Sequence, residues 1–108
     1  MSELPKPPKR FTEFVDQFPK LGEAWSKIAE AGKEGPMDAK TARLIKLGIA
    51  AGSMREGAVH SSVRKALAIG ITEAELMQVV ALTAGTLGMP STVAVYSWIK
   101  EEIAKQAQ

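Results

Sequence analysis

The chain has 108 residues, of which 45% are hydrophobic, so it is long and apolar enough for one small domain with a packed core. Its 14 basic and 12 acidic residues nearly balance, and the basic ones do not gather on one predicted helix. We therefore expect no nucleic-acid partner. Cysteine is absent, which excludes disulfides, thiol-based peroxide reduction and cysteine–metal sites.

The first ten residues and the hydropathy pattern bear on location. The segment MSELPKPPKR is polar and rich in proline, and it lacks the apolar centre of a signal peptide. No run of residues is long and apolar enough to span a bilayer, so we expect no membrane partner. We expect residues 1–10 to form a mobile N-terminal arm, residues 11–108 to form one helical domain, and the protein to be cytoplasmic.

Helical periodicity begins directly after this arm. The apolar residues at helical spacing are Phe11, Phe14, Val15 and Phe18. The spacing continues through Trp25. Because the residue before a proline avoids the helical region, Pro19 is expected to divide the stretch into a short helix and a longer one. Asp38 is then an expected N-cap for a helix over residues 39–52.

Further capping signals predict three more helices. A helix is expected over roughly residues 54–69, with Gly70 as its C-terminal stop. Thr72 and Glu75 form a capping-box pattern at the start of the next helix. A last helix is expected to open near Pro90. No segment shows the period-two alternation of a strand, so the sequence predicts an all-α domain of five or six helices.

Two of these helices, over residues 39–52 and 72–88, are apolar around most of their circumference. A domain of this size cannot easily surround two such helices by itself, because it has too few residues to cover them. Burial against other subunits would cover them. We therefore expect a homo-oligomer.

The helix over residues 54–69 carries the chain's single histidine, His60, with Glu56 and Arg64 four residues to either side. At about 100° per residue, its apolar face spans an arc of roughly 100°. This face consists of Val59, Val63, Ala66 and Leu67. Glu56 falls inside the arc and His60 at its edge, so both are expected to point partly inward. An inward carboxylate needs a partner, and His60 lies one turn away.

This pair suggests acid–base chemistry. A carboxylate that holds an imidazole fixes its tautomer, which suits a histidine for proton transfer near neutral pH. The guanidinium of Arg64 matches a substrate carboxylate. A surface row of ion pairs and a structural histidine are the simpler alternative. One histidine and one glutamate are too few for a zinc site, so a metal would need ligands from a neighbouring subunit, and we expect neither a metal nor an organic cofactor.

Residues 38–100 resemble the carboxymuconolactone decarboxylase family, which includes alkylhydroperoxidase D-like proteins. The segments that carry the resemblance are KTARLIKLGIAAG, EGAVHSSVRKALAIGITEAEL and TLGMPSTVAVYSW. The resemblance implies an all-helical, alkylhydroperoxidase D-like fold and a homo-oligomer, often a trimer or a hexamer.

The resemblance also shows which family chemistry is missing. Peroxidase members carry a Cys-x-x-Cys-x-x-x-His motif and a glutamate on the preceding helix. When the sequences are registered on Ala66 and Gly70, the cysteines correspond to Arg55 and Ala58, the histidine to Ser62 and the glutamate to Arg43. All four residues are replaced. The family's peroxiredoxin-type activity is therefore excluded in this chain.

Decarboxylase members need no cysteine, metal or organic cofactor. The resemblance therefore favours cofactor-free acid–base chemistry, a decarboxylation or a proton transfer, on a small organic acid or lactone, as in a lyase. His60 is expected to be the general acid or base and Glu56 its orienting partner. Arg64, helped by Arg43, Arg55 or Ser62, is expected to bind an anionic group of the substrate. The alternative is a non-enzymatic module for small-molecule binding or assembly that has lost the thiol site.

Overall fold

The structure is a computed structural model that describes residues 8–108. These residues form six α-helices and no strand, which confirms the all-α class. The helices are α1 (Lys9–Gln17), α2 (Pro19–Lys33), α3 (Ala39–Gly52), α4 (Glu56–Ala68), α5 (Glu73–Leu87) and α6 (Met89–Gln106). No helix within residues 8–108 has the length and hydropathy needed to cross a membrane.

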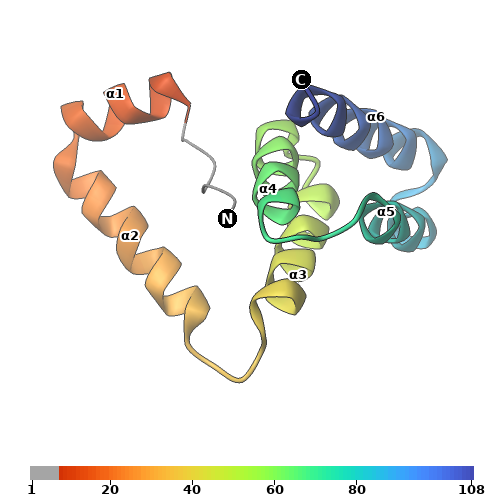
Figure 1. The fold of residues 1–108 in the computed structure, drawn as a ribbon, viewed down its shortest axis with the longest axis horizontal. Coiled ribbons are helices and arrows are strands. Elements are labelled where there is room, and N and C mark those ends of the chain that lie inside the picture. The colour runs from red at the N-terminus through yellow and green to blue at the C-terminus, as the bar shows by residue number, and fades with distance from the viewer. Residues whose placement is uncertain (1–7) are drawn as a thin grey trace.

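Helices α3 to α6 form the body of the molecule (Figure 1). In this bundle α4 packs against α3 and α6, and α5 packs against the same two helices. Small and branched side chains fill the space between them. The core consists of Leu47, Ala50, Ala51, Val59, Val63, Ala66, Ile71, Leu76, Val80, Val95 and Ile99.

Local capping explains where several helices begin and end. The carboxylate of Asp38 accepts a hydrogen bond from the backbone N–H of Thr41 at 2.7 Å, and this contact lowers the pKa of Asp38 below its usual value. Thr72 and Glu75 form the expected capping box at the start of α5. Gly70 has a φ of 88°, so the chain leaves α4 in the left-handed region that favours glycine. These predictions are confirmed.

Two helix starts differ slightly from the prediction. Helix α4 begins at Glu56, two residues later than expected, because Met54 adopts a φ of 54° that a helix cannot contain. Helix α6 begins at Met89, and Pro90 occupies the first turn, where a proline costs no hydrogen bond.

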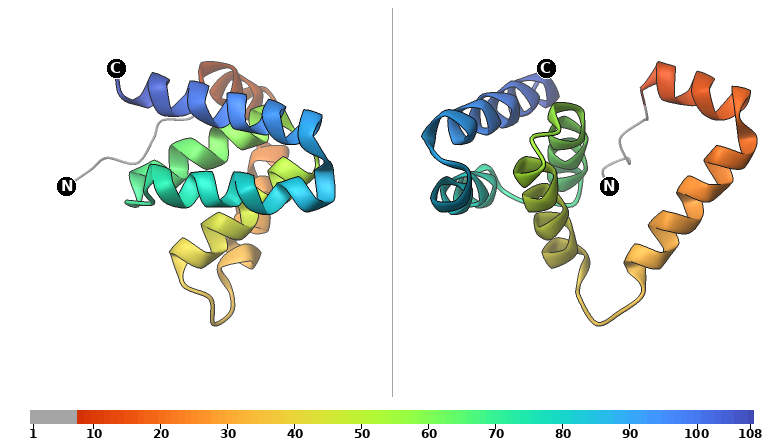
Figure 2. Two further views of the ribbon diagram at one scale, coloured as in Figure 1. Left: turned by 90° about the vertical axis from the view of Figure 1, so that its right-hand side faces the viewer. Right: turned by 180° about the vertical axis from the view of Figure 1, so that it is seen from behind.

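Helices α1 and α2 form an N-terminal hairpin that is set apart from the bundle, as Figures 1 and 2 show. They are divided at Pro19 as predicted, and neither contains a buried residue. Residues 1–7 of the expected arm lie outside the described residues, and α1 already begins at Lys9. The exposed large apolar side chains of the hairpin are Phe11, Phe14, Phe18, Leu21, Trp25 and Ile28.

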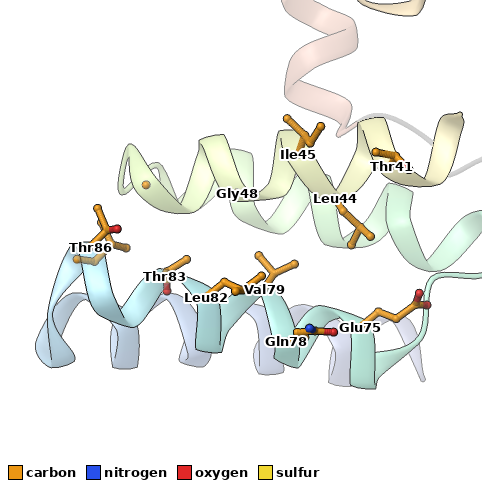
Figure 3. A pocket seen from close by; sticks show the side chains of 12 residues that line it. Thr41, Leu44, Ile45, Gly48, Glu75, Gln78, Val79, Leu82, Thr83 and Thr86 are labelled. Atoms are coloured by element: carbon orange, nitrogen blue, oxygen red, sulfur yellow. The ribbon is translucent and has the colours of Figure 1, made fainter. Parts of the chain in front are cut away.

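The two helices predicted to be apolar all round, α3 and α5, are only partly covered within one chain. Ile45, Ile49 and Leu82 are 43%, 62% and 72% exposed. A groove of about 610 Å³ runs between the two helices, and Leu44 of α3 and Val79 of α5 point toward one another across it (Figure 3).

Candidate functional site

His60 lies on α4 with 23% of its side chain exposed, and it faces α6. Its Nδ1 lies 2.9 Å from Oε1 of Glu102, whose side chain is only 2% exposed. The second carboxylate oxygen of Glu102 accepts a hydrogen bond from Nε2 of Gln106, one turn further along α6. A buried carboxylate is tolerated when its oxygens are hydrogen-bonded, and both oxygens of Glu102 are.

This contact fixes the orientation of the imidazole. A carboxylate that carries its charge can only accept hydrogen bonds, so Nδ1 of His60 donates to Glu102 whenever Glu102 is ionised. In the neutral ring the lone pair is then on Nε2, which points away from Glu102. A histidine held in this way is arranged to accept a proton at one defined nitrogen.

Two exposed carboxylates flank Nε2 of His60. The Oε2 atoms of Glu56 and Glu101 each lie 3.7 Å from it, and their side chains are 59% and 62% exposed. The expectation that Glu56 points inward is wrong. Glu56 is the first residue of α4, and the buried arc of this helix is centred nearer Val59 and includes Ser62, so Glu56 lies beyond its solvent edge.

A cavity of about 720 Å³ lies beside His60, between the bundle and the N-terminal hairpin. The bundle contributes His60, Ser61, Arg64, Lys65, Glu102 and Lys105, and the hairpin contributes apolar side chains that include Phe11 and Trp25. The volume is in the range of small-molecule sites, and the mixture of an apolar wall with a few polar groups is typical of them.

Arg64 brings a cation to this cavity. One of its terminal nitrogens donates to Oγ of Ser61 at 3.5 Å. Its Nε is buried and has no hydrogen-bond partner among residues 8–108. A buried N–H without a partner is costly, so an acceptor supplied by a ligand would stabilise this arrangement.

The remaining predicted anion-binding residues are placed differently. Arg43 of α3 donates to Oγ of Ser62 at 3.5 Å, and Ser62 is 4% exposed. Burial lowers the pKa of Arg43 from its usual value. Arg43 lines a neighbouring hollow rather than the His60 cavity. Arg55 is exposed at the N-cap of α4 and lines neither space, so the structure does not bring it to His60.

Sequence reasoning did not find Glu101 and Glu102. The signal for Glu102 was present, because Glu102 follows Val95 and Ile99 at helical spacing, and both are fully buried. A carboxylate on the core-facing stripe of a helix requires a buried partner. The contact itself joins residues 42 positions apart, which no local pattern specifies.

The site also contains three potential metal ligands. One ligand atom each from Glu56, His60 and Glu101 lie within 4.8 Å of one another. Three protein ligands with an open position are usual at catalytic zinc sites. The sequence analysis expected a metal to need a ligand from a neighbouring subunit. Glu101 supplies a third potential ligand atom from the same chain.

A family model described as the carboxymuconolactone decarboxylase family matches residues 19–101. The chain belongs to this family. The apo form of a carboxymuconolactone decarboxylase family protein from Legionella pneumophila has a similar structure. The TM-score is 0.75 and the identity 23%, over 84% of this chain and 82% of that chain. No curated protein matches the chain.

Membership of the carboxymuconolactone decarboxylase family confirms the resemblance seen in the sequence, and the structural match confirms the alkylhydroperoxidase D-like fold. This member has no cysteine, so a catalytic role in it must come from other side chains. The oriented imidazole of His60 beside Arg64 is the arrangement in the described structure with the clearest capacity for proton transfer.

Proposed function

We propose that this protein is a cofactor-free acid–base enzyme of the carboxymuconolactone decarboxylase type, acting on a small organic acid or lactone. One observation carries the proposal: a buried carboxylate, Glu102, holds the imidazole of His60 at 2.9 Å beside a cavity that also presents Arg64. His60 is the general acid or base, Glu102 positions it, and Arg64 binds the substrate carboxylate.

The proposed reaction needs no cofactor. Nε2 of His60 takes a proton from a hydroxyl or from a carbon next to a carbonyl, and returns a proton to the product. In a decarboxylation the carboxylate leaves as CO₂ and its electron pair remains on the neighbouring carbon, where the returned proton is placed. Glu56 and Glu101 stabilise the imidazolium formed in between, because both carboxylates lie 3.7 Å from Nε2.

A substrate screen in D₂O tests this proposal. The protein is incubated with a panel of small lactone carboxylates and keto acids, and NMR follows deuterium incorporation and substrate loss. For any substrate found, His60→Ala is expected to lower kcat/KM by about 10²–10⁴-fold. Arg64→Gln is expected to raise KM. Full turnover by His60→Ala would contradict the proposal.

A non-enzymatic binding or assembly module remains the alternative, and the replacement of the family's thiol motif by Arg55, Ala58, Ser62 and Arg43 supports it. Saturable binding of a panel compound without deuterium incorporation or turnover would favour this alternative over catalysis.

A metal centre is a further alternative, supported by the three clustered ligand atoms of Glu56, His60 and Glu101. Elemental analysis of the purified protein tests it. A stoichiometric divalent metal that is lost in His60→Ala and Glu101→Gln would favour the metal centre over the metal-free mechanism.

We also propose that the chain assembles with copies of itself, as a trimer or a hexamer. The support is the apolar surface that one chain leaves uncovered, on the N-terminal hairpin and on the Ile45, Ile49 and Leu82 surface of α3 and α5. Surfaces of this kind on a small domain mark interaction sites. Light scattering coupled to size exclusion measures the subunit number, and a monomer at micromolar concentration would contradict this proposal.

A further inference from the structure

A second hollow, of about 360 Å³, opens between α2 and the α3–α4 side of the bundle and is lined by four cationic side chains. These are Lys33 from α2, Arg43 and Lys46 from α3, and Lys65 from α4. No acidic residue of the described part of the chain lines it. The remaining lining residues are apolar or small: Trp25, Ile28, Ala29, Gly32, Ala39 and Ala42. We call this hollow the basic pocket.

Within residues 8–108, the cations of the basic pocket have no ion-pair partner. Lys100, in contrast, pairs with Glu73 at 3.0 Å. Burial, followed by the positive charges of Arg43, Lys46 and Arg64, lowers the pKa of Lys65 below its usual value. Like charges held together destabilise the fold, and an anion bound between them would remove that cost.

We propose that the basic pocket binds a small organic anion with at least two negative charges, of the phosphate monoester class, whose apolar part lies against Trp25. Four cations exceed what one carboxylate can neutralise. The guanidinium fork of Arg43 and the ammonium groups of the lysines suit the several oxygens of a phosphate group. The volume admits a small molecule, and the indole of Trp25 provides an apolar wall beside the charges.

The basic pocket is distinct from the His60 cavity but adjoins it. Trp25 and Lys65 line both spaces, whereas His60 and Glu102 line only the cavity and Arg43 and Lys46 line only the basic pocket. Binding of the anion needs neither the imidazole nor its carboxylate. The inference therefore stands apart from the acid–base proposal and is tested without any turnover.

The fluorescence of Trp25 reports binding directly. In a Trp98→Phe background, where Trp25 is the remaining tryptophan, phenyl phosphate is titrated against the full-length protein at neutral pH and physiological salt. We expect a saturable change in Trp25 emission. Benzoate, which has the same ring and a single charge, is expected to bind at least about tenfold more weakly. Inorganic phosphate is expected to compete with phenyl phosphate, because the charged group provides most of the affinity.

Variants separate the basic pocket from its surroundings. Lys33→Gln combined with Lys46→Gln removes two cations that line the basic pocket but not the His60 cavity. This variant is expected to weaken phenyl phosphate at least about tenfold, because both lysines would donate to the phosphate. Lys9→Gln combined with Lys20→Gln removes the same two charges from α1 and α2 outside the basic pocket, and it is expected to change the affinity less than about twofold. His60→Ala should bind as the parent protein does. Circular dichroism checks that each variant keeps its helical content.

Chemical labelling of the parent protein gives a second readout, which does not depend on whether a variant folds. An amine that loses its proton readily reacts faster with acylating reagents, so mass spectrometry should find Lys65 modified early, and phenyl phosphate should slow its modification several-fold. Lys20 is the internal reference and should be unaffected. The inference is overturned if phenyl phosphate gives no saturable response, if benzoate binds as tightly, or if the Lys33 and Lys46 variant binds as the parent does.

Discussion

Replacement of the buried carboxylate tests the geometry on which the proposed mechanism depends. Glu102→Gln keeps the shape of the side chain but offers one oxygen and one N–H₂ group where the carboxylate accepted from both His60 and Gln106. Both hydrogen bonds can then persist only if His60 moves its hydrogen to Nε2 or Gln106 turns its amide, and neither bond keeps a charged acceptor. A hydrogen bond to a charged group contributes about 1.5–3 kcal/mol, and loss of the buried charge offsets part of this. We expect a net cost of about 2 kcal/mol, or roughly 8 °C in Tm.

Glu101→Gln is the matched control, because it makes the same chemical change one residue away. Glu101 is 62% exposed and its nearest oxygen lies 3.7 Å from Nε2 of His60. Exposed pairs of this kind contribute about 0–1 kcal/mol, so this variant should unfold within about 0.5 kcal/mol of the parent. Urea unfolding is followed by circular dichroism at one fixed protein concentration, since self-association would shift the midpoint.

The ring itself provides the decisive assay. His60 is the chain's single histidine, so ¹⁵N-histidine labelling gives a spectrum of this ring alone. In the neutral form we expect the hydrogen on Nδ1 in the parent and in Glu101→Gln, and a redistribution between the two nitrogens in Glu102→Gln. Equal unfolding of the two variants together with unchanged ring spectra would refute the assignment of Glu102 as the group that positions His60.

Three further predictions concern stability and assembly. Lys65→Gln should raise stability at neutral pH by about 0.5 kcal/mol, because the folded chain binds this proton less tightly than the unfolded chain does. The gain should fade as the pH rises from the lowered pKa of Lys65 in the folded chain toward its pKa in the unfolded chain, about 10.4. A gain that stays constant over this pH range would contradict the charge argument. Thr72→Ala removes the capping box and should cost about 1 kcal/mol in urea unfolding, whereas Thr86→Ala within α5 should cost less. Ile49→Glu places a charge on the exposed apolar surface and should reduce the subunit number in light scattering without loss of helical content; an unchanged assembly would remove Ile49 from the interface.

The parts of the fold that were predictable from the sequence are those fixed by near neighbours. The cap at Asp38, the capping box of Thr72 with Glu75 and the stop at Gly70 each involve groups within a few residues, so sequence spacing determines them. The all-α class was predictable for the same reason, because helical periodicity is a pattern of residues three and four positions apart. The error of two residues at the start of α4 arose at Met54, whose left-handed backbone has no sequence signature.

The candidate site was only half predictable because its central contact is long-range. The helical arc placed His60 correctly at the edge of the core, but it assigned the partner carboxylate to Glu56 on the same helix. The structure supplies Glu102 from α6, and the packing of α4 on α6 brings the two together. Glu102 lies on the same face of α6 as the buried residues Val95 and Ile99, so a charged residue on this apolar face was the sequence feature that pointed to it.

The site around His60 is not a repaired version of the family's thiol site. Arg55, Ala58 and Ser62, the positions that the sequence resemblance assigns to the thiol motif, point about 140–160° around α4 from His60, at about 100° per residue. Ser62 contacts Arg43 of α3, whereas His60 contacts Glu102 of α6. The two faces of α4 therefore serve different spaces. Arg64 and Ser61 line the same cavity as His60, whereas Arg43 lines the basic pocket, so the proposed substrate would meet Arg64 and Ser61. Cysteines introduced at Arg55 and Ala58 would leave the contact between His60 and Glu102 unchanged. Peroxide reduction by such cysteines would therefore not report on His60, whose chemistry has to be assayed with substrates that contain no peroxide.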